Sequence, residues 1–157
     1  MLPKPNLVLV QKSLPIGSPI ATVFGFMSNH ENYARWFPGV VAIRSPDDLP
    51  HGTVGKIYDE TLALPAGRLR TISIQVLESH APVSFVMQAD FAPLHPRTEI
   101  RLVEKSADET ILNWTFVSRS QSTIGRFLLR ALARKPLERR SAAGLRKLKK
   151  LLEEESR

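Results

Sequence analysis

The sequence predicts an α+β fold in which a curved antiparallel sheet closes over a long C-terminal helix. The first observation is a helical pattern over residues 122–155, the longest in the chain, in which apolar residues recur at helical spacing with Lys and Arg between them. The second is a succession of strand-like runs before it, with no other long helix. Because an amphipathic helix must bury its apolar stripe, the sheet is its expected partner.

Length and composition fit one globular domain spanning residues 1–157. A chain of this length buries roughly two thirds of its unfolded surface and folds without a metal or disulfide. The absence of cysteine excludes a disulfide scaffold and thiol catalysis. The apolar run at residues 7–10 is too short for a signal peptide or a membrane span. We therefore expect a cytoplasmic protein.

The N-terminal part predicts one strand followed by two short helices. Residues 7–14 have strand character and end at a Pro-Gly-containing turn. A helix follows over residues 18–27, in which the Ser18 hydroxyl is expected to cap and the proline after it occupies the first turn. A capping box at residues 28–31 predicts a second short helix over residues 30–36.

From residue 40 the pattern changes to strands separated by turn residues. Alternation of apolar and polar side chains is clearest around Ile72 and Ile74, and again around Phe85 and Met87. Together with the first strand this gives about seven strands, without a repeat or a linker. The six later strands are expected at residues 40–44, 53–62, 70–80, 83–91, 98–104 and 112–116.

The C-terminal helix carries the charge of the protein. From residue 122 onward there are eleven Lys or Arg and four Asp or Glu, whereas the other 121 residues hold eleven of each sign, so the formal net charge of +7 lies on this helix. Pro136 predicts an interruption or kink within it. The apolar stripe expected to pack on the sheet comprises Ile124, Phe127, Leu128, Ala131, Leu132, Leu137, Leu145, Leu148, Leu151 and Leu152.

Two local segments stand out, SPIATVFGF at residues 18–26 and NHENYARWFPGV at residues 29–40. Together with this order of elements, they resemble the START-like (SRPBCC) superfamily of helix-grip proteins, in particular its polyketide cyclase/dehydrase and lipid-transport branch. The resemblance covers nearly the whole chain and implies a helix-grip fold with a cavity between the concave sheet face and the long helix. It implies little about activity, because the superfamily includes carriers, cyclases and ribosome-associated factors.

Such a cavity suits an apolar or aromatic ligand held by a few polar groups. Trp36 and Phe37, at the end of the second short helix, are expected either to form a lid over its mouth or to plug the end of the sheet. For each apolar position the alternative is an ordinary core role. The residues expected to face the cavity from the sheet and the long helix are Phe85, Met87, Trp114, Phe116, Phe127 and Ala131.

Polar residues on otherwise apolar faces are the candidates for anchoring a ligand. Tyr58 and Glu60 share one face of their strand, and Arg70 is in phase with the inward-facing residues of the next. Glu60 could form a buried ion pair with Arg70, or a ligand-anchoring pair with Tyr58. The alternative is that these strand ends are exposed at an edge.

Motifs for metal or cofactor chemistry are absent from the sequence. The four histidines are isolated and are expected at the surface, so no metal site and no cofactor are predicted. The main functional hypothesis is binding or transport of a small hydrophobic molecule such as a lipid, a quinone or a polyketide-like compound. The second is a polyketide aromatase/cyclase-type enzyme that uses Tyr58 and Glu60 for acid/base chemistry.

The basic side of the C-terminal helix has three interpretations. It is a solvated face, an attachment site for an anionic membrane surface, or a contact with ribosomal RNA in a ribosome-associated factor. No aromatic residue lies among the basic positions from Arg139 to Lys150 to stack on bases. DNA is not expected as a partner.

Overall fold

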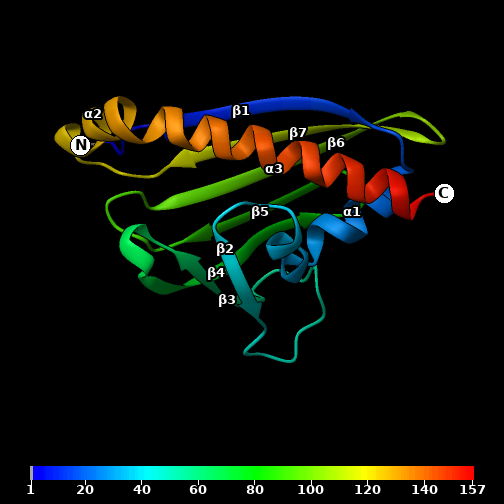
Figure 1. Ribbon diagram of the computed structural model, residues 1–157, viewed down its shortest axis with the longest axis horizontal. Coiled ribbons are helices and arrows are strands. Elements are labelled where there is room, and N and C mark those ends of the chain that lie inside the picture. The colour runs from blue at the N-terminus through cyan, green and yellow to red at the C-terminus, as the bar shows by residue number, and fades with distance from the viewer. Residues whose placement is uncertain (1) are drawn as a thin grey trace.

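A computed structural model describes residues 2–157 and confirms the predicted α+β helix-grip fold (Figure 1). A seven-stranded antiparallel sheet curves around the C-terminal helix, and the two short helices follow the first strand. The strands are β1 (Leu7–Ile16), β2 (Val40–Arg44), β3 (Ile57–Ala63), β4 (Leu69–His80), β5 (Ser84–Ala89), β6 (Pro96–Ser106) and β7 (Glu109–Ser118).

The strand order β1-β7-β6-β5-β4-β3-β2 is an antiparallel meander to whose last strand the first strand is added. Register shifts within β1, β2, β4 and β6 mark bulges, which increase local twist and help the sheet to curve. Because β1 and β2 form the two edges, the connection between them has to pass from one edge to the other. This connection contains α1 (Ile20–Ser28) and the 3₁₀ helix η1 (His30–Arg35).

The caps of these short helices differ in detail from the prediction. Asn29, not Ser28, caps η1, because its side-chain oxygen accepts the N–H of Glu31 at 3.1 Å. Ser18 does not cap α1; its hydroxyl lies 2.7 Å from that of Ser156 and so joins the start of α1 to the C-terminal end of the chain. A residue type common at caps is used here for a tertiary contact.

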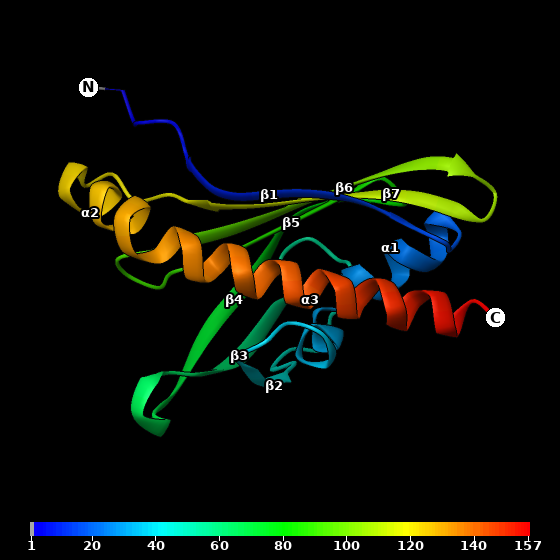
Figure 2. The same cartoon turned by 45° about the horizontal axis from the view of Figure 1, so that its top comes forward.

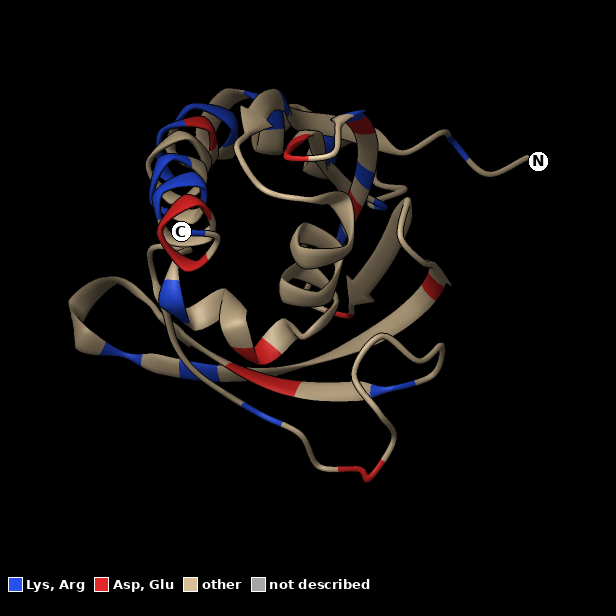
Figure 3. Cartoon of the chain, turned by 90° about the vertical axis from the view of Figure 1, so that its right-hand side faces the viewer, with Lys and Arg blue, Asp and Glu red and all other residues tan. Residues whose placement is uncertain are grey.

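The C-terminal helix is built from three segments that follow one another along one course (Figures 1 and 2). They are α2 (Thr123–Leu128), a π-helical turn η3 (Leu129–Ala133) and α3 (Arg134–Glu155). Viewed along this helix, the sheet curves around the space beside it, and many of the Lys and Arg residues gather on the helix (Figure 3). The buried side chains of α3 are Ser141, Leu145, Leu148 and Leu152, and Gly144 is buried among them.

Only part of the predicted apolar stripe packs on the sheet. Leu137 and the leucines after it do so, but the α2–η3 part of the stripe does not, because Phe127 is 69% exposed and Ala131 is also exposed. The inward orientation predicted for these two residues is therefore wrong. The exposed residues of this part are Ile124, Phe127, Leu128, Ala131 and Leu132.

The π turn explains the difference. In an uninterrupted α-helix, the buried stripe of α3 would continue from Leu137 to Arg134 and Arg130. A π turn holds one extra residue, which rotates the preceding turns by about 100°. In η3 the N–H of Arg134 accordingly donates to the carbonyl of Leu129, five residues earlier. Leu129 is buried in place of Arg130, and Phe127 turns outward. Pro136 is the third residue of α3, so the interruption predicted at this proline is observed as the π turn just before it.

Candidate functional site

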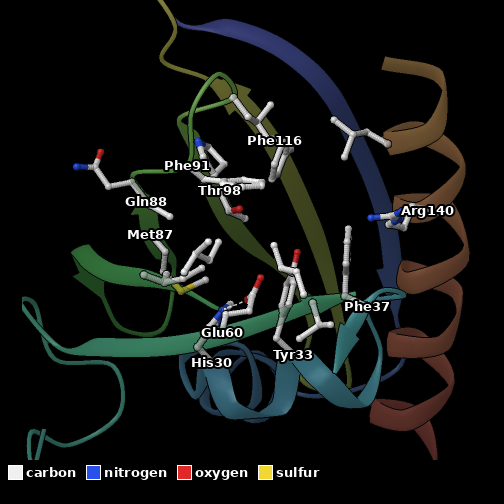
Figure 4. Close-up of a pocket in the computed structure, with 18 of the residues that line it drawn as sticks. His30, Tyr33, Phe37, Glu60, Met87, Gln88, Phe91, Thr98, Phe116 and Arg140 are labelled. Carbon is white, nitrogen blue, oxygen red and sulfur yellow. Dashed lines mark hydrogen bonds and ion pairs between the residues drawn. The ribbon is translucent and has the colours of Figure 1, made fainter. Parts of the chain in front are cut away.

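An apolar cavity of about 150 Å³ lies between the concave face of the sheet and the N-terminal half of α3 (Figure 4). The sheet supplies most of its wall from β3 to β7, and α3 contributes Leu137 and Arg140. Its apolar walls include Leu62, Ile72, Ile74, Met87, Phe91 and Phe116.

The cavity exists because α1 covers only part of the concave face. Where α1 packs, the sheet is filled: Phe24 meets Phe85 edge to face at 6.3 Å, and Phe85 is fully buried. Met87 and Ala89 lie on the same face of β5 but farther along it, and both line the cavity. The inward face of β5 therefore contributes to the core at one end and to the cavity wall at the other.

An aromatic cluster on η1 and the segment after it closes one side of the cavity. Tyr33 stacks on Phe37 at 4.9 Å and meets Trp36 edge to face at 4.6 Å. Trp36 is 2% exposed and packs beside Gly144 of α3, so it plugs the fold and is no lid. Phe37 and Tyr33 line the cavity.

The polar end of the cavity is a buried pair formed by His30 and Glu60. His30 Nε2 lies 2.7 Å from Glu60 Oε2, and the two side chains are 3% and 6% exposed. The expectation that His30 lies at the surface is wrong. Figure 4 shows the Glu60 carboxyl group and the Tyr33 hydroxyl pointing toward the same space, which gives the apolar cavity a small set of hydrogen-bonding groups.

Arg70 does not pair with Glu60. It is exposed at the start of β4, where its guanidinium lies over the ring of Phe91, 4.7 Å from the centroid. Opposite Glu60 in the β3–β4 register stands Ile72. Arg70 is therefore exposed, although β4 is an interior strand of the sheet, whereas Glu60 is buried and its partner lies on η1.

Tyr58 shares a buried face with Glu60, as the alternation of β3 predicts. Its hydroxyl is 2.8 Å from His51 Nδ1, and the two rings stack with centroids 5.8 Å apart. Tyr58 is not among the residues that line the cavity. The hydrogen-bonding partner of Glu60 is thus His30 and not Tyr58.

The predicted candidates fall into three groups. Phe37, Glu60, Met87 and Phe116 line the cavity. Trp36, Tyr58, Phe85 and Trp114 are buried in the core beside it. Arg70, Phe127 and Ala131 are exposed.

Sequence reasoning missed His30, Tyr33 and Arg140. For the first two a signal existed, because they are three residues apart in a short helix and face the same side of a 3₁₀ turn. No signal distinguished Arg140 from the other basic residues of α3.

Both tyrosines of the chain are buried at or beside the site. Burial, followed by the nearby Glu60 carboxylate, raises the pKa of Tyr33 well above 10.0, and burial raises the pKa of Tyr58 to about 12. A phenol whose pKa is higher in the folded state stabilises the fold below its unfolded pKa, and this contribution is lost as the pH rises through the folded value.

We therefore expect stability to fall from pH 10 toward pH 12, with phenolate absorbance appearing mainly as the chain unfolds. An ultraviolet titration followed in parallel with circular dichroism measures both. Ionisation of the tyrosines near pH 10 in a protein that remains folded would contradict the burial of the two rings.

Two further findings concern the part of the chain that the structure describes. No group of three or more His, Cys, Asp or Glu side chains is placed there to hold a metal ion. None of the helices in residues 2–157 has both the length and the apolar composition that a bilayer crossing requires.

A curved antiparallel sheet that holds a long C-terminal helix over an apolar cavity defines the START-like, helix-grip class of proteins. Within this class the chain belongs to the family described as polyketide cyclase/dehydrase and lipid transport, whose family model matches residues 8–153. No curated protein sequence matches the chain.

Solved structures of the same fold share little sequence with the chain. The KanY protein is 14% identical with a TM-score of 0.71, over 96% of this chain and 99% of KanY. A START superfamily protein from Mycobacterium smegmatis is 14% identical with a TM-score of 0.69, over 92% and 97% of the two chains. StfQ, a di-domain ARO/CYC protein from the steffimycin biosynthetic pathway, is 14% identical with a TM-score of 0.68 over 95% of this chain. The chain spans 52% of StfQ, about half of its length.

Proposed function

We propose that the protein binds or transports a small hydrophobic molecule in the cavity beneath α3. The observation that carries the proposal is the cavity itself, whose mainly apolar wall includes the hydrogen-bonding groups of Glu60, His30 and Tyr33. Apolar walls supply affinity through burial, and a few fixed polar groups orient the ligand. The family to which the chain belongs includes lipid transport in its description.

The size of the cavity limits what it can hold. A space of about 150 Å³ is comparable to an engineered cavity that binds benzene. We therefore expect one ring, or the end of a larger lipid, quinone or polyketide-like molecule, to be enclosed. A hydroxyl or carbonyl on this ring would meet the groups at Glu60 and Tyr33, and the remainder of the ligand would extend past the rim.

Filling the cavity should block uptake. Ala89 is buried on β5 and lines the cavity, so Ala89→Leu adds three carbon atoms inside it. With 1-naphthol as probe in isothermal titration calorimetry, we expect at least about tenfold weaker binding with the fold retained.

The matched control is Ala131→Trp, a larger addition at an exposed residue of η3 that does not line the cavity. We expect it to leave 1-naphthol binding within about twofold of the wild type. Equal binding by wild type and Ala89→Leu, or loss of binding in Ala131→Trp alone, would place the probe elsewhere and count against the proposal.

The second candidate is a polyketide aromatase/cyclase-type enzyme, and the His30–Glu60 contact favours it. A carboxyl group and an imidazole 2.7 Å apart, beside an apolar site, are suited to removing a proton next to a substrate carbonyl and returning it to a departing hydroxyl. The Tyr33 hydroxyl, which points toward the same space as the Glu60 carboxyl group, can donate a hydrogen bond to the developing oxyanion. In this reaction Glu60 and His30 take the roles that the sequence assigned to Glu60 and Tyr58.

One assay distinguishes the two candidate functions. Incubation with a linear poly-β-ketone analogue, followed by mass spectrometry, gives the unchanged analogue if the protein only binds. Cyclisation with loss of water gives a product lighter by one water molecule. Formation of the cyclised product at a higher rate than in a reaction without protein would favour the enzyme.

A further inference from the structure

The exposed apolar residues of α2 and η3 form a surface that the fold itself does not use. We call it the α2–η3 patch and define it as Ile124, Phe127, Leu128 and Leu132. Three of its members are about 70% exposed, namely Ile124 at 73%, Phe127 at 69% and Leu132 at 71%. Large apolar side chains gathered on one helical segment, and not scattered singly, mark an interaction surface.

Basic side chains surround this patch. Residues 122–137 contain Arg126, Arg130, Arg134 and Lys135 and no acidic residue. Arg130 and Lys135 are exposed, while Arg126 donates to the carbonyl of Pro5 at 2.8 Å. Arg134 and Glu138 form an ion pair at 3.4 Å, in which the side chains are 57% and 41% exposed. The surface therefore combines an apolar centre with an excess of positive charge.

We propose that the α2–η3 patch docks on the surface of an anionic phospholipid bilayer. An interfacial helix inserts Phe and Leu side chains at the boundary of headgroups and acyl chains while Lys and Arg meet anionic lipids, and the patch supplies both parts. The π turn is what creates it, because the turn rotates Phe127 outward and keeps Arg130 at the surface.

A second copy of the chain fits this surface less well. A symmetric contact through the patch would place the basic residues around it in one copy, Arg130, Arg134 and Lys135, near the same group of residues in the other. Such like-charge contacts oppose association. A nucleic acid would satisfy the charges but would leave Ile124 and Leu132 without a function, since bases stack on aromatic rings.

The location of the patch connects it to the cavity. Leu137 and Arg140 line the cavity on the same helix, shortly after η3. Figures 1 and 2 show α2 at the same end of the molecule as the β3–β4 turn, which follows the cavity-lining Leu64. Docking would therefore bring one end of the cavity wall close to the lipid phase. A link between docking and the cavity rests on the proposed ligand-binding function, whereas docking on the bilayer does not depend on that function.

Vesicle sedimentation with the full chain tests the proposal. With phosphatidylcholine vesicles that contain about 30% phosphatidylserine, we expect at least about tenfold tighter binding than with pure phosphatidylcholine. Phe127→Ser combined with Leu132→Ser should lose at least about tenfold of this binding. Both residues are exposed, and circular dichroism checks that the fold is retained.

The matched control is Val83→Ser combined with Val103→Ser, two exposed apolar residues outside the patch, which should stay within about twofold of the wild type. Three results would overturn the proposal. They are equal sedimentation with and without phosphatidylserine, unchanged binding by the Phe127/Leu132 variant, and a dimer or a ribosome complex that depends on the patch while vesicles are not bound.

Discussion

Replacing His30 by Leu should lower the free energy of unfolding by about 3–5 kcal/mol, since it removes one partner of a buried ionisable pair. Glu60 would keep its buried position on β3 without the imidazole that lies 2.7 Å away. A buried carboxyl group without its partner bears its full desolvation cost. Urea denaturation near neutral pH measures the difference.

The double variant His30→Leu with Glu60→Leu is the control. Substituting apolar residues for both members of a buried pair is often neutral or stabilising, so we expect it to recover most of the lost stability. If the single variant is as stable as the wild type, or if the double variant is no more stable than the single one, the pair does not have the role assigned to it.

Replacing Gly144 by Leu should lower the free energy of unfolding by about 3 kcal/mol, the upper end of the usual cost of overpacking. A Cβ atom at Gly144 would already lie 3.1 Å from Pro38 Cδ and 3.3 Å from ring atoms of Trp36 and Phe37. The remaining carbons of a leucine have to push α3 away from the aromatic cluster. Because Phe37 also lines the cavity, probe binding should weaken as well.

Gly25 provides the comparison, since it also lies within a helix but a Cβ there would meet no atom within 4 Å. Gly25→Ala should raise stability by about 0.5–1 kcal/mol through helix propensity alone. Thermal and chemical denaturation of the two variants separate the effect of packing from that of propensity. A Gly144→Leu protein as stable as the wild type would mean that α3 does not press on Trp36 and Phe37.

Local patterns were sufficient to predict the fold. The bounds predicted for β2, residues 40–44, are those observed, and alternation placed β4 and β5 within one or two residues of their observed bounds. The inward residues of β4 are buried and alternate with exposed ones, so the period of two is visible directly in its sequence. The cavity residues Met87 and Phe116 follow from the same alternation.

The rest of the site depended on contacts between elements that are distant in the sequence. Alternation placed Phe85, Met87, Trp114 and Phe116 on inward faces, but whether such a residue is core or cavity wall depends on how far α1 and the aromatic cluster extend over the sheet. His30 and Glu60 are thirty residues apart, and neither lies in a motif that indicates the other. The outward rotation of Phe127 depends on one π turn, which α-helical periodicity does not encode.

Methionine methyl NMR tests most directly whether the hollow beneath α3 is a ligand site. The sequence contains three methionines; Met87 lines the cavity, whereas Met27 is buried in the core outside it. With ¹³C-methyl-methionine protein and 1-naphthol, we predict that the Met87 signal moves in a saturable manner while the Met27 signal stays in place. A Met87 signal that does not move at probe concentrations where calorimetry records binding would contradict the account.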